Sequence, residues 1–260
     1  MTQISFSKYQ GAGNDFIIID DRSGRICPDV ELFSNWCNRR FGIGADGVML
    51  VRNHSELDFE MLYFNADGRE GSMCGNGGRC IAAFARELGI TGTESRFMAV
   101  DGPHRARISD GEVSLEMKDV SRVEENEGDY ILDTGSPHFI RITNQLTNLD
   151  VIGEGRAIRY NDRFREEGIN VNFVEPVGQR YAVRTYERGV EDETFACGTG
   201  VTAVALAMAV KEGHYGAMKT ELQARGGLLT VQFQRDDEQS FSGIYLSGPA
   251  VLVYQGEILI

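Results

Sequence analysis

Two cysteines, Cys74 and Cys197, each open a glycine-rich segment of the form Cys-Gly-(Asn/Thr)-Gly. Each segment runs directly into an alanine-rich apolar stretch, which predicts a helix that begins close to the cysteine. A thiol at a helix N-terminus is acidified by the helix dipole and by backbone N–H groups that have no helical partner. Two such thiols could remove a proton from one face of a carbon atom and return one to the other face. The pair therefore indicates a racemase or epimerase that needs no cofactor.

The backbone amides after each cysteine could stabilise the charge that this reaction creates. When the α-proton of an amino acid leaves, negative charge moves onto the α-carboxylate, and consecutive N–H groups can bind that carboxylate. Such groups are available at Gly75-Asn76 and at Gly198-Thr199. Pyridoxal phosphate is the other common electron sink, and the sequence leaves it open because its lysine needs no extended motif.

The remaining cysteines, Cys27, Cys37 and Cys80, are interpreted as small buried hydrophobes. An odd total of five cysteines without a secretory context predicts reduced thiols. Their spacings match no zinc pattern, and only four histidines are available as further ligands. We therefore expect no metal site.

Composition excludes several other classes of protein. The 260-residue chain has a formal net charge of −13, which argues against a nucleic-acid surface because such surfaces usually need a basic face. Residues 1–20 alternate polar and apolar residues and lack a basic region followed by an apolar run, so no signal segment is predicted. The longest apolar stretch, Val201 to Val210, is far shorter than the ~20 residues that a membrane span requires. We expect a soluble cytoplasmic protein with a small-molecule substrate.

The elements that must position the cysteines follow the same order in both halves of the chain. Tyr63 and Tyr186 each lie eleven residues before a cysteine, at the end of a predicted strand. Further strands follow each cysteine helix, and the acidic stretch Glu124 to Asp129 is predicted to connect the halves. Helices are predicted over Asp29–Arg40, Gly77–Leu88, Val151–Arg159 and Val201–Lys211.

This order predicts an α+β fold of two pseudo-symmetric halves, with the active site in the cleft between them. In each half a β-sheet or partly closed barrel is expected to wrap around a central apolar helix. The helix after Cys197 is apolar on nearly every side, so it should be buried all round. The expected domains are residues 1–123, completed by the C-terminal strand 250–260, and residues 124–249.

Seven motifs, in the same order over essentially the whole length, give the chain a resemblance to the diaminopimelate epimerase family. A single Cys-Gly-x-Gly would be weak evidence, whereas seven elements in family order are strong evidence. The matching segments are Lys8–Phe16, Phe41–Gly47, Phe64–Gly68, Met73–Cys80, Gly135–His138, Gly168–Phe173 and Glu187–Gly200.

The resemblance implies the epimerisation of LL-2,6-diaminopimelate to the meso isomer, without a cofactor, in the supply of lysine and peptidoglycan precursors. It assigns Cys74 and Cys197 as the acid/base pair, with His138 assisting Cys74 and Glu187 assisting Cys197. A homodimer is a further expectation at family level. The distal amino-acid end of the substrate would be held by Asn14, Asn65, Asn170, Glu187 and Arg188. An ammonium and a carboxylate at that end need acidic, guanidinium and amide partners together.

Two other interpretations stay open. Proline, hydroxyproline and histidine racemases use related scaffolds, although their substrates lack a second amino-acid end. A cysteine-based redox switch would also use thiols of low pKa. The chain carries Ser136 where many family members have Asn; serine is shorter but can still donate and accept hydrogen bonds. The acidic run Glu191-Asp192-Glu193 is expected to form a solvated turn.

Overall fold

The computed structural model describes residues 3–71, 73–109 and 111–259. The chain divides into two compact units, which are described separately below. The first unit comprises Met1–Leu115 together with Gly248–Ile260, and the second comprises Glu116–Ser247.

The first unit is a mixed sheet that encloses one helix. Its strands pair in the order β17-β1-β2-β3-β4-β5-β6-β7, and only β2–β3 and β4–β5 are parallel among these pairs. The C-terminal strand thus pairs with the N-terminal one. The elements are β1 (Gln3–Gly11), β2 (Asn14–Asp20), α1 (Val30–Cys37), β3 (Gly47–Arg52), β4 (Phe59–Asn65), α2 (Gly75–Glu87), β5 (Glu94–Ala99), β6 (Gly102–Ser109), β7 (Glu112–Glu116) and β17 (Val251–Leu259).

The second unit repeats this architecture. Its strands pair in the order β8-β9-β10-β11-β12-β14-β15-β16, with the short β13 added to β12, and β10–β11 and β12–β14 are parallel. The elements are β8 (Val123–Asn126), β9 (Asp129–Asp133), β10 (Pro137–Ile142), the 3-10 helix η1 (Leu146–Asn148), α3 (Val151–Arg159), β11 (Asn170–Val177), β12 (Arg180–Glu187), β13 (Asp192–Thr194), α4 (Gly198–Lys211), β14 (Gly216–Ala224), β15 (Gly227–Arg235) and β16 (Phe241–Pro249).

The sequence of antiparallel and parallel pairings is the same in both units. Parallel neighbours cannot be joined by a tight hairpin, so each parallel pair requires a crossover, usually a helix. In the first unit α1 joins β2 to β3 and α2 joins β4 to β5; in the second, α3 and α4 make the equivalent connections. The predicted α+β fold of two pseudo-symmetric halves is confirmed, and both cysteine helices occupy the second crossover of their unit.

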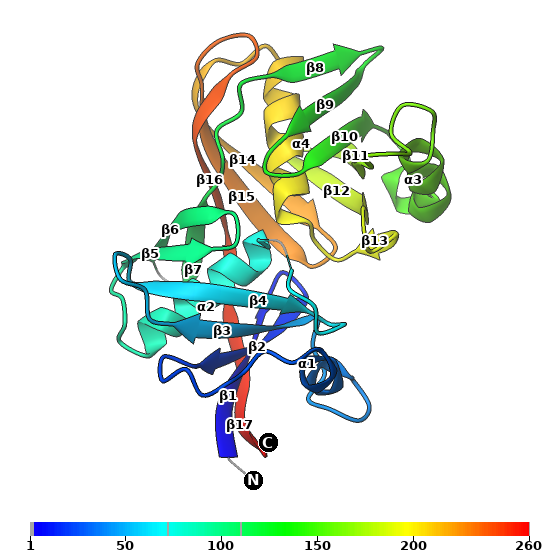
Figure 1. Cartoon of the computed structure of the whole chain (residues 1–260). Coiled ribbons are helices and arrows are strands. Elements are labelled where there is room, and N and C mark those ends of the chain that lie inside the picture. The colour runs from blue at the N-terminus through cyan, green and yellow to red at the C-terminus, as the bar shows by residue number, and fades with distance from the viewer. Residues whose placement is uncertain (1–2, 72, 110, 260) are drawn as a thin grey trace. The chain divides into compact units, whose positions relative to one another are not determined.

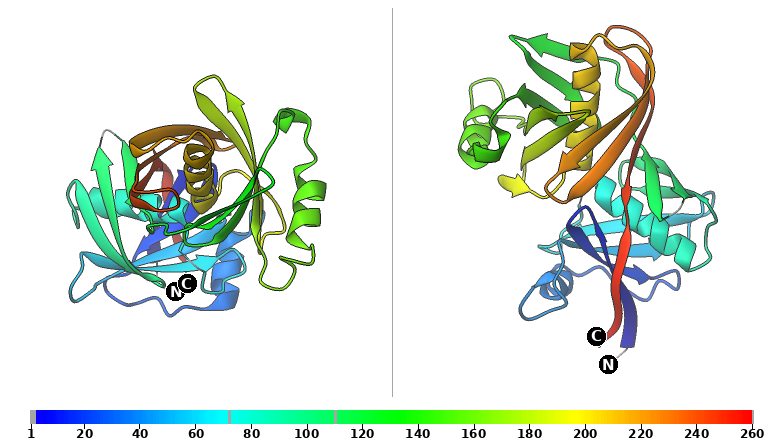
Figure 2. Two further views of the ribbon diagram at one scale, coloured as in Figure 1. Left: turned by 90° about the horizontal axis from the view of Figure 1, so that it is seen from above. Right: turned by 180° about the vertical axis from the view of Figure 1, so that it is seen from behind.

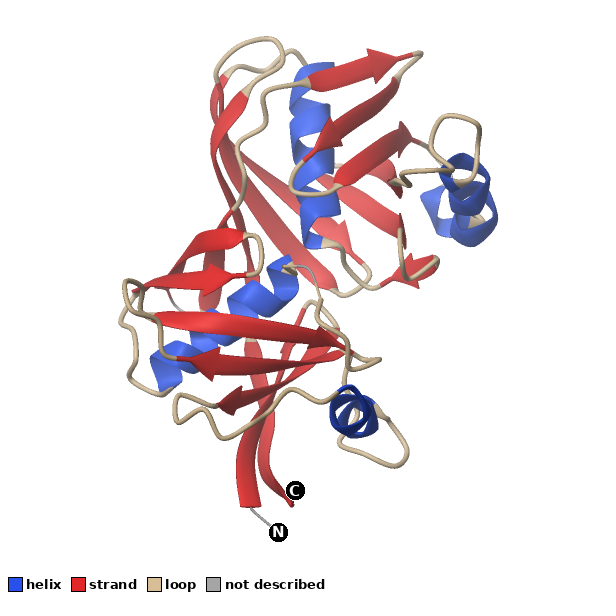
Figure 3. Cartoon of the chain, in the orientation of Figure 1, coloured by secondary structure: helices blue, strands red, loops and turns tan. Residues whose placement is uncertain are grey.

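The helix α4 is buried on every side, as its composition predicts. It contacts strands β9, β10, β11, β12, β14 and β15 of its own unit. Figures 1 and 2 show the helix lying along the curved sheet, and Figure 3 shows the strands arranged around it. The equivalent α2 contacts β1, β2, β3 and β6 and exposes only its C-terminal end. No helix in the described ranges has the length and apolar character needed to cross a membrane.

The acidic stretch Glu124 to Asp129 is not a connection between the halves, so that prediction is wrong. It forms most of a hairpin in which β8 pairs with β9. Glu127 and Gly128 turn the chain with φ values of 53° and 86°, a backbone that suits a two-residue hairpin. Val123 and Tyr130 are buried at 5% and 3% exposure, so single inward-facing residues anchor a segment that is otherwise polar.

Shortening a side chain in the middle of α4 tests how far the second unit depends on this helix. Leu206→Ala removes a side chain with 0% exposure, so the free energy of unfolding should fall by about 2–5 kcal/mol. Leu228→Ala, at a position 37% exposed in the same unit, is the control and should cost less than about 1 kcal/mol. Urea unfolding followed by circular dichroism measures both changes. Equal losses would show that α4 does not carry the core of this unit.

Candidate active site

Cys74 caps the N-terminus of α2 in an extended conformation, with φ −112° and ψ 122°. Its carbonyl accepts the first helical hydrogen bond, from Gly78 N at 2.8 Å. The first N–H groups of a helix have no partner within it. Helices α1 and α3 satisfy one of these groups through the side chains of Asp29 and Asp150, whereas α2 has no side-chain cap. The first turn of α2 is therefore suited to bind an anion.

A hydrogen-bond network surrounds the sulfur of Cys74. Its Sγ lies 3.4 Å from Asn14 Oδ1, which also accepts from Asn76 Nδ2 at 3.4 Å. Asn14 Nδ2 donates to Asp46 Oδ2 at 2.6 Å, and Arg79 Nη2 donates to Asn76 Oδ1 at 2.9 Å. The structure thus brings two of the predicted residues, Asn14 and Asn76, together beside the Cys74 thiol.

Asn65 belongs to the same unit and ends strand β4. Its backbone accepts from Gly68 N at 2.9 Å and donates to Arg69 O at 2.8 Å, which closes a turn after the strand. Its side chain is exposed, so it is available to a ligand on this side of the unit.

Cys197 caps α4 in nearly the same conformation, with φ −106° and ψ 111°, and this helix also has no side-chain cap. Its Sγ lies 3.4 Å from Thr199 Oγ1, and Thr199 Oγ1 lies 2.9 Å from His138 Nε2. His138 Nδ1 lies 3.1 Å from Asn172 Nδ2. A continuous chain of hydrogen-bonding groups therefore leads from β11 through β10 to this sulfur.

Gly200 permits this arrangement because its Cα approaches the network closely. A Cβ at this position would lie 2.4 Å from Asn172 Oδ1 and 3.3 Å from His138 Cε1. Any larger residue would displace these side chains, so the second glycine of Cys-Gly-x-Gly is required by packing rather than by backbone conformation.

His138 is completely buried, and its environment keeps it neutral. Burial, and then the positive charge of Arg188, lower the pKa of His138 to about 3. The imidazole is therefore uncharged over the physiological range of pH. The resemblance pairs this residue with Cys74, whereas the described contacts connect it to Thr199 and Asn172. Its assistance to Cys74 stays a prediction.

Asn170 organises the segment that carries Glu187 and Arg188. Its Nδ2 donates to Ser136 Oγ at 2.8 Å, and its Oδ1 accepts from Arg188 N at 2.9 Å. The guanidinium of Arg188 donates to Glu167 O at 2.9 Å, and Glu187 is the last residue of β12. Ser136 thus contacts a predicted binding residue.

The acidic run after this segment is not a solvated turn, so that expectation is wrong. Glu193 accepts hydrogen bonds from Nε and Nη2 of Arg184, at 2.7 Å each, and it pairs with Arg225 at 3.2 Å. Glu191 accepts from the hydroxyls of Tyr160 and Tyr186 at 3.0 and 2.9 Å. Both carboxylates therefore anchor the chain between Glu187 and Cys197.

Sequence reasoning did not find several polar residues that support the site. Asp46 and Asn172 fix the amide of Asn14 and the ring of His138, and Arg79 holds Asn76. Two of them left a signal, because Arg79 and Asn172 are polar residues inside otherwise apolar or glycine-rich elements. Both are 0% exposed, and buried polar groups need partners.

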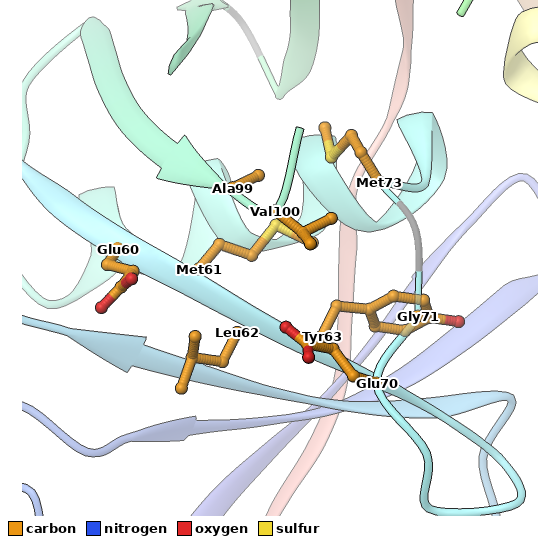
Figure 4. Close-up of a pocket in the computed structure, with 9 residues that line it drawn as sticks. All are labelled: Glu60, Met61, Leu62, Tyr63, Glu70, Gly71, Met73, Ala99 and Val100. Atoms are coloured by element: carbon orange, nitrogen blue, oxygen red, sulfur yellow. The ribbon is translucent and has the colours of Figure 1, made fainter. Parts of the chain in front are cut away.

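A pocket in the first unit lies beside the segment that precedes Cys74 (Figure 4). Its walls include none of the predicted site residues, and its apolar side chains come from β4, from the end of β5 with the residue after it, and from Met73. It is lined by Glu60, Met61, Leu62, Tyr63, Glu70, Gly71, Met73, Ala99 and Val100. Within the described ranges, no group of three or more His, Cys, Asp or Glu side chains is arranged to hold a metal ion.

Comparison with known proteins gives a consistent result over the whole chain. The sequence model described as Diaminopimelate epimerase matches residues 6–132 and 130–253. The chain belongs to the diaminopimelate epimerase family. A diaminopimelate epimerase of Flavobacterium psychrophilum is 45% identical over 96% of this chain and 98% of its own. One from Chlorobaculum tepidum is 42% identical over 95% and 98%.

Solved structures show the same fold in more distant proteins. A Bacillus anthracis protein of the PhzF phenazine biosynthesis family matches with a TM-score of 0.78 and 16% identity, covering 100% of both chains. A hydroxyproline epimerase from Agrobacterium vitis, with bound trans-4-hydroxy-L-proline, matches with a TM-score of 0.71 and 14% identity over 98% of this chain and 92% of its own. At this identity the likeness concerns the fold alone.

The low pKa of His138 predicts a specific loss of stability in mild acid. His138 takes up a proton near pH 6.5 in the unfolded chain but only near pH 3 in the folded chain. The free energy of unfolding is therefore at its full value above pH 6.5 and falls as the pH decreases below 6.5. Between pH 7.5 and 5 the wild type should lose up to about 2 kcal/mol more of its unfolding free energy than His138→Gln. Urea unfolding at both pH values checks this. An equal loss in the two proteins would contradict a buried neutral imidazole.

Proposed function

We propose that this chain converts LL-2,6-diaminopimelate to meso-2,6-diaminopimelate through two thiols, as an isomerase that supplies lysine and peptidoglycan precursors. The observation that carries the proposal is the repeated placement of a cysteine as the cap of a buried helix. Cys74 and Cys197 occupy equivalent crossovers of the two units, and neither helix has a side-chain cap. The diaminopimelate epimerases that match the chain over nearly its full length support the choice of substrate.

In the proposed reaction one cysteine is a thiolate and the other a thiol. The thiolate removes the α-proton, the thiol delivers a proton to the opposite face, and the two exchange roles when the other isomer binds. The first-turn N–H groups at Gly75-Asn76 and Gly198-Thr199 bind the α-carboxylate, and they stabilise the charge that moves onto it. This arrangement supplies electrostatic stabilisation from the protein itself, so the proposal includes no cofactor and no metal.

The distal end of the substrate needs partners for an ammonium and a carboxylate. We assign this role to Asn14, Asn65, Asn170, Glu187 and Arg188. The contact between Asn170 Oδ1 and Arg188 N fixes two of these residues relative to each other, and Glu187 directly precedes Arg188. Assistance of Cys197 by Glu187, and of Cys74 by His138, is part of the same proposal. For His138 it concerns the complex with substrate, since both ring nitrogens contact Thr199 and Asn172 in the structure.

A homodimer is proposed from the exposed apolar residues of β17. Val251, Leu252, Val253 and Tyr254 are between 37% and 55% exposed, and Leu259 is 61% exposed. A strand with so much apolar surface favours association, because natural proteins usually protect such strands from water and from unwanted pairing. We further propose a cytoplasmic location, since none of the five cysteines, all of them in the described ranges, forms a disulfide.

Deuterium exchange tests the reaction directly. Reduced protein incubated with LL-diaminopimelate in D₂O, without pyridoxal phosphate, should form the meso isomer with deuterium at the α-carbon. Cys74→Ser and Cys197→Ser should each lower the rate by ~10²–10⁴-fold, because each removes one of the two acid/base groups. Cys27 is exposed, so its interpretation as a buried hydrophobe is wrong. Because Cys27 lies outside both half-sites, Cys27→Ser is the matched control. Proton NMR and chiral chromatography measure the products.

Absence of exchange in folded, reduced protein would reject this substrate. Proline, hydroxyproline and histidine would then be tested in the same assay, because they are substrates of related scaffolds. If none of these amino acids exchanges, and if Cys74→Ser and Cys197→Ser change only the response of the protein to oxidants, the redox-switch interpretation is favoured.

A charge on β17 tests the proposed dimer. The wild type should elute with twice the chain mass of 28.8 kDa in light-scattering chromatography. Val253→Lys places a charge in the apolar surface and should shift the protein to the monomer. Val177→Lys, at a position 56% exposed in the second unit, is the control and should remain dimeric. A monomeric wild type would contradict the proposal.

A further inference from the structure

The donor and the acceptor can be assigned for each hydrogen bond between Asn172 and Cys197, starting from the backbone carbonyl of Phe139. Phe139 O is a carbonyl and can only accept, and it lies 3.2 Å from Asn172 Nδ2. Asn172 Oδ1 accepts from Thr185 Oγ1 at 2.9 Å. The amide of Asn172 is therefore oriented with its NH₂ group toward Phe139 O and His138 Nδ1.

This orientation selects the tautomer of His138. Because Asn172 donates to Nδ1, this ring nitrogen must accept. The buried ring is neutral, so its single proton is on Nε2, which faces Thr199 Oγ1 at 2.9 Å. His138 therefore donates to the hydroxyl of Thr199.

The hydroxyl of Thr199 then has its proton available for Cys197. Its oxygen accepts from His138, and its remaining polar neighbour in this chain of contacts is Cys197 Sγ at 3.4 Å. A hydroxyl that donates to sulfur stabilises the thiolate more than the thiol, because hydrogen bonds to a charged acceptor are stronger.

The direction is reversed at Cys74. Asp46 accepts from Asn14 Nδ2 and Asn76 donates toward Asn14 Oδ1, so both neighbours turn the carbonyl oxygen of Asn14 toward the cysteine. This oxygen lies 3.4 Å from Cys74 Sγ and cannot donate. It stabilises the thiol, which can donate its S–H, and it does not stabilise the thiolate.

We infer that Cys197 is the thiolate and Cys74 the thiol of the resting protein, and that the hydroxyl of Thr199 is the positioning group that holds Cys197 ionised. This assignment has a consequence for the reaction that rests on the proposed function. The resting enzyme is ready to remove the α-proton from the isomer that presents its α-hydrogen to Cys197. Asn172 and His138 act through Thr199 by fixing the direction in which it donates.

Charged groups near both sulfurs bear on this assignment. On the Cys197 side, His138 comes from β10, and Glu187 and Arg188 lie at the end of β12. Charged residues of the other strands against α4 have partners away from the sulfur: Asp129 with Arg141, Glu221 with Arg180, and Arg235 with Ala209 O at the far end of the helix.

On the Cys74 side the main opposing group is Arg79, whose side chain is 0% exposed. Its Nη1 lies 3.3 Å from Gly75 O, and its charge acts on Cys74, Cys80 and Glu112. From the strands against α2, Lys8 and Asp15 pair with each other at 2.8 Å and Tyr9 bonds Glu87. A buried cation favours the thiolate at Cys74, so the inference requires that hydrogen-bond direction outweigh this charge.

Alkylation resolved by residue decides between these effects. Wild-type protein without substrate is treated briefly with iodoacetamide from pH 5 to 9, and peptide mass spectrometry gives the rate at each cysteine. The midpoint of each pH profile reports the pKa of that thiol, whereas the absolute rate also depends on exposure, which is greater at Cys74. We expect a lower midpoint for Cys197 than for Cys74.

Three variants test the role of the hydroxyl. Thr199→Val keeps the shape but removes the donor, so the midpoint of Cys197 should rise by about one pH unit, a tenfold loss of thiolate at a given pH. Thr199→Ser should restore the lower midpoint. Thr202→Val is the matched control on the same helix, because Thr202 Oγ1 donates to Gly198 O at 3.0 Å and not to the sulfur.

A midpoint for Cys74 equal to or below that of Cys197 would overturn the inference, and so would an unchanged midpoint in Thr199→Val. These readings need no turnover, so they are independent of the exchange assay. Protein that shows the expected midpoints but no exchange would disprove the proposed function and leave the assignment of the thiols standing. Rates of epimerisation cannot replace this test. The ratio of kcat/KM in the two directions must equal the equilibrium constant of the reaction, whichever thiol is ionised in the free protein.

Discussion

The site depends on two helices that each begin at a cysteine and have no side-chain cap. In this chain the ordinary solution is present at α1 and α3, where Asp29 and Asp150 cap the first turn. A cap of this kind is worth about 1 kcal/mol. Helices α2 and α4 instead begin at cysteines without a side-chain cap, and each is buried within the sheet of its unit. Contacts with the surrounding strands hold both helices in place, so each helix forms without the stabilisation that a side-chain cap supplies.

Much of the fold was predictable because local patterns and packing agree. The apolar surface of α4 predicts its burial, and the cysteines mark the first residues of both central helices. The hairpin of β8 and β9 was not predictable from composition, because a few inward side chains such as Val123 outweigh a run of acidic residues. The stability of such a segment comes from the pairing of β9 with β10 and from the packing of β9 against α4, and the composition of the segment contains no information on either.

The candidate site divides in the same way. Residues within the motifs, such as Asn14, Asn76 and Thr199, were named from the sequence, and the structure groups them around the two thiols within their own units. The groups that orient them come from other elements. Asn172 reaches His138 because β10 and β11 are parallel neighbours, and Glu193 reaches Arg184 because β13 adds to β12. Strand register decides these contacts, so no motif predicts them.

A duplicated scaffold with identical half-sites would give its two thiols equal acidity. Two thiols of equal acidity share a single proton without preference. The fraction of molecules in which one particular cysteine is the thiolate and the other the thiol then never exceeds half. Here equivalent positions carry different groups: Arg79 donates to Gly75 O in α2, and Thr202 donates to Gly198 O in α4. The neighbours of the sulfurs differ as well, with an amide oxygen at Cys74 and a hydroxyl at Cys197. The repeat supplies two equivalent helix ends, and these substitutions within it make the two thiols unequal.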